Sequence, residues 1–597
     1  MEGKSRSGRG RGCRAAQGGW GVQNKLAAAA LAAVLLGSAQ AAAQGPAGAV
    51  VPRQGTPIPE LAPPAQPRVG PGAAAPAVPP PADGAALDQT LAITVVDLSG
   101  ATAFPQDQIL AAAGPLTGPA IPVRRIEAAR AAILGLYRAA GYVFTTVDAV
   151  VERGGRLRLA VNEAQITEVQ LDGDIGPAGT QVLRLLNNLV GQRPIDVATL
   201  ERWLLLAEDV PGVSLRSLLR PSGTAPGALS LVAQVSRRPV TGYLAADNRG
   251  YKLTGPEQAL AAVQFNSFTE FGERTELSLF YGAGRTQLFG QASSEFFVGG
   301  SGARVRLYAG LGESTPSAPL RDLGYQGETT VAGVALAYPL IRRRQQSLTL
   351  SAALDLIESE IRFEGGLLGD QLLSRDSLRV LRLGGDWVLY DQFAGDARPA
   401  VNALTLRLHQ GLSGLGASES GDPELSRAGA RTDFTKLTFE LTRAQTLFSP
   451  WPGASVALQG TIAGQWTDDV LPQAEKFYLG GSRLGRGYYA GEVTGDRALA
   501  GSLELQLAIP WETPVFGQSV RVDPLLYAFY DVGRTWENLA QDPDRDIASL
   551  GLGARFSLTE NAEFQLEGVH RLERRPGGAQ AEELKRDALF WRVLFRL

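Results

Sequence analysis

Cysteine and histidine are almost absent from this chain. Its 597 residues include one cysteine, Cys13, and two histidines, His409 and His570. Cys13 lies in an amino-terminal segment that we expect to be removed, so the mature chain would carry no thiol and need no disulfide management in an oxidising compartment. This excludes thiolate catalysis and a cysteine-based zinc site. Neither histidine sits in a visible Ser/His/Asp arrangement, so we predict no enzyme, no catalytic residue, no metal and no cofactor.

Long apolar runs are also lacking. After residue 43 no stretch of the sequence approaches the roughly 18 consecutive apolar residues of a membrane helix, which excludes a helical membrane protein. There is no excess of positive charge either. Removing residues 1–43 takes away six basic residues and Glu2, which moves the formal charge from −3 to −8, and nothing in that balance favours a nucleic-acid partner.

The first 90 residues show a targeting segment followed by a linker. A long basic region precedes the 11-residue apolar stretch Leu26–Leu36, and small residues with Ala-x-Ala spacing follow, so we predict a signal peptide over 1–43. The alternative, a membrane anchor, needs a longer apolar stretch. Twelve of the 36 prolines lie between Pro46 and Pro81, which predicts an extended linker over 44–90.

An internal repeat follows the linker. The segment ITVVDLSG (93–100) returns 73 residues later as ITEVQLDG (166–173), and each copy begins the order strand, helix, helix, strand, strand. In the first copy a long helix follows Pro122 and ends at Gly141; in the second, Asp196 caps a helix. Two copies are too few for a solenoid. We therefore predict two α+β domains, 91–164 and 165–238.

From 239 to 597 the hydrophobic period becomes two. Leu503, Leu505 and Leu507, for example, alternate with Ser502, Glu504 and Gln506. The candidate strands number sixteen: 241–248, 259–267, 275–283, 288–299, 303–312, 329–340, 346–361, 374–391, 400–414, 434–447, 455–467, 498–510, 521–536, 549–558, 562–574 and 588–597. Short gaps follow the even-numbered strands and longer gaps mostly follow the odd-numbered ones. This pattern predicts a 16-stranded antiparallel transmembrane β-barrel with both ends in the periplasm, rather than a β-sandwich or propeller.

The longest gap, 30 residues between Thr467 and Ala498, contains an arginine among glycines. Gly485 and Gly487 flank Arg486, and such glycines let the backbone bend sharply while one cation projects. A phosphate-binding loop would need a following Gly-Lys-Ser/Thr and a helix, which are missing. An exposed surface loop remains an alternative. A later strand places Tyr527, Phe529, Asp531 and Gly533 on one face; if that face points inward, Arg486 can reach Asp531 as a two-toothed ion pair.

These motifs resemble those of the two-partner secretion transporters, the haemolysin secretion/activation proteins of the outer-membrane assembly superfamily. The resemblance rests on GRGYYAGE (485–492), FYDVG (529–533), DNRGYKLTG (247–255), and two repeats similar to POTRA domains, and it covers about 91–597. It implies that Arg486, Gly487 and Tyr488 form the tip of a sixth extracellular loop that folds into the lumen. Phe529, Asp531 and Gly533 match the strand motif that receives it.

The resemblance also implies a bacterial outer-membrane pore that exports one large, β-helical partner protein without ATP, with the POTRA domains in the periplasm. The expected partners are this secreted client, outer-membrane lipid and the barrel assembly machinery; neither nucleic acid nor a small-molecule substrate is expected. The family's plug helix is not predicted for the proline-rich 45–90. Two alternatives stay open. One is a β-barrel assembly or insertion factor; the presence of only two POTRA repeats and of the long leader argues against it. The other is a small-solute porin, which would lack such repeats.

Overall fold

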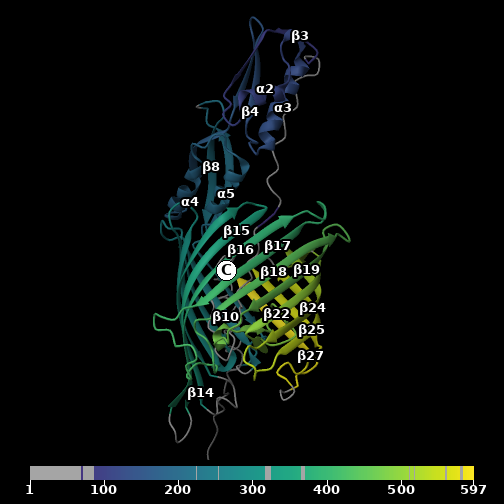
Figure 1. Ribbon diagram of the computed structural model, residues 1–597. Helices are drawn as coiled ribbons and strands as arrows, with labels where there is room; N and C mark the ends of the chain where they lie inside the picture. Colours follow the sequence, from purple (N-terminus) through teal and green to yellow (C-terminus); the bar gives the residue numbers. More distant parts are fainter. Residues whose placement is uncertain are drawn as a thin grey trace, which may run out of the picture.

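The computed structural model describes residues 69–70, 87–223, 225–252, 255–315, 324–364, 370–509, 511–515, 518–558, 561–578 and 583–597. The predicted signal peptide and most of the predicted linker, with the question of a plug helix, lie outside these residues. The described chain is elongated, with two small domains stacked at one end of a barrel (Figure 1).

The first small domain has a three-stranded sheet covered by helices. Its elements are β1 (Thr90–Ile93), β2 (Val95–Ser99), α2 (Gln106–Ala113), β3 (Gly118–Pro122), α3 (Val123–Ala139), β4 (Thr146–Glu152) and β5 (Arg156–Asn162). The sheet order is β2-β5-β4, and β1 pairs separately with β3. Helix α3 buries Ile126, Ala129, Ile133 and Tyr137 on one stripe, and Gly141, with φ +91°, follows its end.

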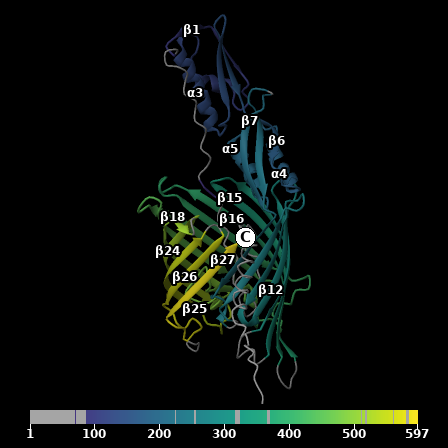
Figure 2. The same ribbon diagram turned by 180° about the vertical axis from the view of Figure 1, so that it is seen from behind.

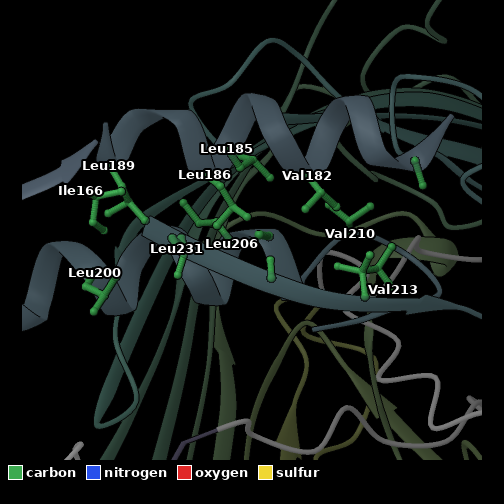
Figure 3. Close-up of a cluster of buried hydrophobic side chains, with 14 of the residues drawn as sticks. Ile166, Val182, Leu185, Leu186, Leu189, Leu200, Leu206, Val210, Val213 and Leu231 are labelled. Atoms are coloured by element: carbon green, nitrogen blue, oxygen red, sulfur yellow. The ribbon is translucent and has the colours of Figure 1, made fainter. Parts of the chain in front are cut away.

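The second small domain repeats this topology. It contains β6 (Gln165–Asp172), α4 (Ala178–Leu186), the 3-10 turn η1 (Asn187–Leu189), α5 (Val197–Glu208), β7 (Val213–Pro221) and β8 (Ala228–Arg237). The carboxylate of Asp196 accepts the backbone N–H of Thr199 and so caps α5. Figure 3 shows Leu185 and Leu186 of α4, Leu206 of α5 and Leu231 of β8 within one apolar core. In both three-stranded sheets the last strand is central: β5 is parallel to β2 and antiparallel to β4, and β8 is parallel to β6 and antiparallel to β7.

The rest of the chain forms a closed antiparallel barrel (Figures 1 and 2). Its strands are β9 (Val240–Asp247), β10 (Gln258–Asn266), β11 (Arg274–Gly282), β12 (Gln287–Phe297), β13 (Arg304–Ser314), β14 (Tyr325–Arg342), β15 (Gln346–Glu364), β16 (Asp370–Asp391), β17 (Ala400–Gly411), β18 (Thr435–Phe448), β19 (Ser455–Trp466), β22 (Arg497–Ala508), β23 (Trp511–Val515), β24 (Gln518–Trp536), β25 (Arg545–Leu558), β26 (Ala562–Arg571) and β27 (Asp587–Arg596). Segments β22 and β23 pair with β24 in one continuous register, so they form a single strand. The predicted sixteen-stranded antiparallel barrel is confirmed.

Period-two alternation places apolar side chains outside this barrel and polar ones inside. Leu503 and Leu505 on β22 are 52% and 48% exposed, whereas Glu504 between them is 5% exposed. An apolar outer face and a polar lumen are what a barrel in lipid requires. Within the described ranges, no helix combines the length and apolar character needed to cross a membrane.

The second domain packs against turns at one end of the barrel. Arg342, at the end of β14, donates from Nε and Nη2 to the two carboxylate oxygens of Asp209, at 2.8 Å each. Arg202 of α5 donates to the carbonyl oxygens of Pro339 and Leu340. The longer connections lie at the opposite end of the barrel, and the longest of them carries the candidate site.

Candidate functional site: a loop anchored inside the barrel

The connection between β19 and β22, here called L6 (467–496), folds back into the barrel. It contains the 3-10 turn η5 (Gln473–Glu475) and a small antiparallel pair, β20 (Phe477–Leu479) with β21 (Val493–Gly495). Between β20 and β21 the chain turns twice: Gly480 N–H donates to Leu484 O at 3.1 Å, and Tyr488 N–H donates to Gly485 O at 2.9 Å. Gly485 has φ +75°, a conformation that favours glycine, and this turn directs Arg486 toward the inner wall.

Arg486 is buried against β22 and β24. It donates to both oxygens of Asp531, from Nε at 3.0 Å and from Nη2 at 2.9 Å, and its backbone N–H adds a third bond to the same carboxylate at 2.8 Å. The guanidinium carbon lies 3.8 Å from the centre of the Phe529 ring. A planar, five-donor guanidinium matches this fork and stacking geometry, which an ammonium cannot reproduce.

Two further side chains contact Arg486, and neither of these contacts was predicted from the sequence. Nη1 is ion-paired with Glu504, and Nη2 donates to the hydroxyl of Ser502 at 2.8 Å, which in turn donates to Asp531. Both residues belong to the polar face of β22. The arginine therefore serves two carboxylates rather than the single one expected.

Gly487 and Tyr488 attach the loop tip to the next strands. Gly487 N–H donates to the hydroxyl of Ser549 on β25 at 3.2 Å, and Gly487 O accepts from Nε of Arg571 on β26 at 2.5 Å. A Cβ at Gly487 would lie 2.4 Å from the Cβ of Ser549, so only glycine permits this approach. The buried Tyr488 hydroxyl lies 2.7 Å from the carbonyl oxygens of both Ala548 and Glu573.

The three strand residues occupy the inward face of β24. Asp531 is fully buried and Phe529 is 4% exposed, while their outward neighbours Tyr530 and Val532 are each 45% exposed. Gly533 provides room for L6, because a Cβ there would lie 2.8 Å from Leu479 Cδ1 on β20. The structure thus brings all six predicted residues together at one contact between L6 and β24–β25.

A second arginine, Arg249, connects L6 to the loop between β9 and β10. Arg249, just after β9, pairs with Glu567 on β26 with both side chains buried, and it stacks on Phe590 of β27 at 4.1 Å. Its carbonyl oxygen accepts the N–H of Ala490 in L6 at 3.0 Å. This arginine belongs to the DNRGY segment, but its partner could not be read from the sequence.

The contacts at this site attach L6 to the barrel wall. The charges of Arg486 and Arg249 each meet a carboxylate on the barrel wall. In the described part of the chain no group of three or more His, Cys, Asp or Glu side chains is arranged to hold a metal.

A closed barrel with an apolar outside, a charged lumen and an inward-folded loop is an outer-membrane β-barrel. A family model described as haemolysin secretion/activation protein ShlB/FhaC/HecB matches residues 228–556, more than half of the chain, and a ShlB-type POTRA domain model matches residues 91–164. The chain belongs to the haemolysin secretion/activation protein family, as its motifs predicted.

Individual relatives are distant. The heme/hemopexin transporter protein HuxB of Haemophilus influenzae (strain 86-028NP) is 23% identical over 423 residues, which cover 69% of this chain and 70% of HuxB. Among solved structures, CdiB from Escherichia coli has a TM-score of 0.67 at 17% identity, covering 88% of this chain and 94% of CdiB. CdiB from Acinetobacter baumannii has a TM-score of 0.58 at 13% identity, covering 96% and 97%. The two structures show that the fold is shared.

Proposed function

We propose that this protein is an outer-membrane pore that exports one large partner protein without ATP and without catalysing a reaction. The family match over the barrel carries the proposal. The architecture supports it: two POTRA-like domains adjoin one mouth of a barrel whose lumen holds a docked loop. Energy would come from folding of the client outside, which withdraws unfolded chain from the pore.

The membrane orientation follows from this assignment. The small domains would lie in the periplasm, and the long loops, including the ends of L6, would face the outside. Outer-membrane lipid would contact the apolar outer band of the barrel, and the barrel assembly machinery would insert it.

The small domains offer a docking surface for an unfolded client. Their sheets end in the edge strands β2 and β4 in the first domain and β6 and β7 in the second. An extended chain can add to such an edge through backbone hydrogen bonds, with pockets for alternate side chains giving specificity. We assign client recognition to these edges.

The role proposed for Arg486, Gly487 and Tyr488, with Phe529, Asp531 and Gly533, is to hold L6 inside the lumen. Removing Arg486 would leave Asp531 and Glu504 as uncompensated buried charges, which costs roughly 3–5 kcal/mol when burial is deep and less where water remains. Arg486→Ala should therefore severely reduce secretion while the barrel still inserts. Arg486→Lys should restore secretion poorly because the fork to Asp531 and the stacking on Phe529 are lost.

We expect a large secreted protein to be encoded beside the gene of this chain, and the deciding experiment expresses the chain together with that protein. We expect secretion of that protein to require the barrel and to fall when residues 91–164 are deleted, with folded barrel in the membrane measured in parallel. Unchanged secretion without the chain would overturn the export function. A general loss of other outer-membrane barrels on depletion would instead support the assembly factor, and uptake of small solutes alone would support the porin.

A further inference from the structure

L6 enters the lumen through a segment that contacts a different part of the wall from Arg486. Glu475, the last residue of η5, is 1% exposed. Its carboxylate accepts from Arg382 Nη2 on β16 at 2.7 Å and is ion-paired with Lys436 Nζ on β18 at 2.7 Å. The backbone carbonyl oxygen of Glu475 also accepts from Lys436 at 2.6 Å and from Gln465 on β19 at 3.2 Å.

The wall around Glu475 is itself ordered by polar contacts. Arg382 Nε donates to Asp355 on β15, which also accepts the hydroxyl of Tyr308 on β13. Arg382 Nη1 contacts Nδ1 of His409 on β17; because a guanidinium only donates, that imidazole nitrogen accepts. A continuous network thus runs from β13 to β19, and Glu475 is the member of it that L6 supplies.

The contacts that Arg486 and Glu475 make with the wall have opposite electrostatic signs. At the tip, the loop brings a cation, Arg486, to two carboxylates on the wall, Asp531 and Glu504. At η5, the loop brings an anion, Glu475, to two wall cations, Arg382 and Lys436. If L6 leaves the lumen, one side of the wall keeps an excess of buried positive charge and the other an excess of negative charge. Opposite signs also specify which part of the loop faces which side.

We propose that Glu475 is a positioning residue that forms a second anchor of L6, complementary in sign to the Arg486 anchor. Together the two anchors hold the loop as a strap across the lumen. Release of L6 then requires both anchors to break, so that weakening either one raises the population of released loop at both ends. The inference rests on the proposed pore function in one respect: that function gives the release of L6 a purpose.

The test uses cysteine labelling, since Cys13 is the sole cysteine of the chain. In a chain carrying Cys13→Ser, Ala474→Cys reports on η5 and Ala490→Cys reports on the segment after the tip; both alanines are 3% exposed. Each reporter is combined with Glu475→Gln, which removes the charge at nearly constant shape, and with Glu475→Asp, which keeps it. The matched control is Glu295→Gln: Glu295 is a buried lumen carboxylate on β12 that pairs with Arg274 and Arg304 and not with L6.

A soluble maleimide is added to folded barrel in lipid, with folding verified by the heat-dependent shift of the band on an SDS gel. In the Glu475→Gln background we expect the distant Ala490→Cys reporter to label about tenfold faster, corresponding to about 1.4 kcal/mol in the opening free energy. Glu475→Asp should give a smaller increase, and Glu295→Gln should give none.

Faster labelling at Ala474→Cys with an unchanged rate at Ala490→Cys would show that Glu475 only orders its own turn, which overturns the proposal. Unchanged labelling at both positions would also overturn it. If Glu475→Gln does not fold, the Glu475→Asp rates decide by the same criterion. The assay contains no client, so accelerated labelling in a chain that secretes nothing would retain the second anchor while rejecting the export function.

Discussion

The barrel wall has a strong side and a weak side. Strands β15 and β16 are paired from Gln346 opposite Leu389 to Glu364 opposite Asp370. Strands β27 and β9, which close the barrel, are paired over five positions, from Arg592 opposite Asp247 to Arg596 opposite Tyr243. Since each ladder position contributes backbone hydrogen bonds and side-chain packing, the seam between β9 and β27 is the weakest line of the wall.

Beyond the paired positions of β9 and β27, further hydrogen bonds close the seam. The side-chain amide of Asn248 donates to Leu589 O at 3.1 Å, and its oxygen accepts the N–H of Trp591 at 2.8 Å, like an additional pair of the ladder. At the other end a backbone hydrogen bond extends the pairing, from Leu597 N–H to Gly242 O at 2.9 Å. Closure by individual side chains concentrates the stability of the seam in a few residues, whereas stability of the opposite wall is distributed along whole strands.

The largest predicted effect that separates the two sides comes from Arg249. Arg249→Ala should lower stability by about 3 kcal/mol, because Glu567 would be left buried without its cation. Arg407→Ala is the control in the strong wall: Arg407 pairs with Asp386, which keeps 31% of its side chain exposed and so retains water. The measurement is the temperature at which the folded band is lost on an SDS gel. Equal losses for the two variants would remove the distinction between seam and wall.

A smaller effect is expected from a methyl group at the seam. A Cβ at Gly242 would lie 2.4 Å from Ala262 O and 3.0 Å from Leu597 Cδ1, so Gly242→Ala should force β9 to shift at a cost of about 1–3 kcal/mol. Gly290→Ala on β12 is the matched control, since no atom lies within 4 Å of its Cβ position. Denaturant unfolding in lipid measures the stability of both variants. An unchanged stability of Gly242→Ala would show that β9 can shift at the seam without cost.

The smallest effect is expected from Asn248. Asn248→Ala removes both side-chain hydrogen bonds at the seam and should lower stability by about 1–2 kcal/mol, with faster hydrogen exchange at the N–H of Trp591. Asn402→Ala on β17 makes a similar deletion beside an intact ladder: its amide donates to Leu389 O and Asp391. It should leave exchange in the neighbouring strand slow. Local opening after Asn402→Ala but not after Asn248→Ala would reverse the comparison.

The sequence predicted the barrel well because its signal is repeated along each strand. All sixteen predicted strands overlap strands of the structure, and the largest errors lie at strand ends: β14 begins at Tyr325 rather than 329, and the strand ending at 510 continues as β23 to Val515. The pair β1–β3 was missed because strands of four and five residues, one of them with two prolines, show no usable periodicity.

The site was predicted less completely, for a reason of geometry. Charge and strand face indicated that Arg486 would meet Asp531. Glu504 belonged to a recognised polar face, but its contact with the same arginine depends on the register that sets Ser502 opposite Asp531, which alternation does not specify. Glu475 carries no local signal, because its partners on β16 and β18 lie 93 and 39 residues away in the chain.

The long strands β14 and β15 also show where the apolar outer band of the barrel ends. On the outward face of β14, Leu340, Leu336 and Val334 are followed by Thr330, Glu328 and Gln326, all exposed. On β15 the change falls between Leu356 and Glu358, and the strand continues to Glu364, roughly 20 Å farther along the chain. On this side the sheet extends beyond the apolar band, and the loop after β17 packs against it through hydrogen bonds of Ser426 to Asp376. The barrel wall at this mouth is therefore higher on the side of β14, β15 and β16, and a polypeptide that leaves the barrel passes the surface of the sheet on that side.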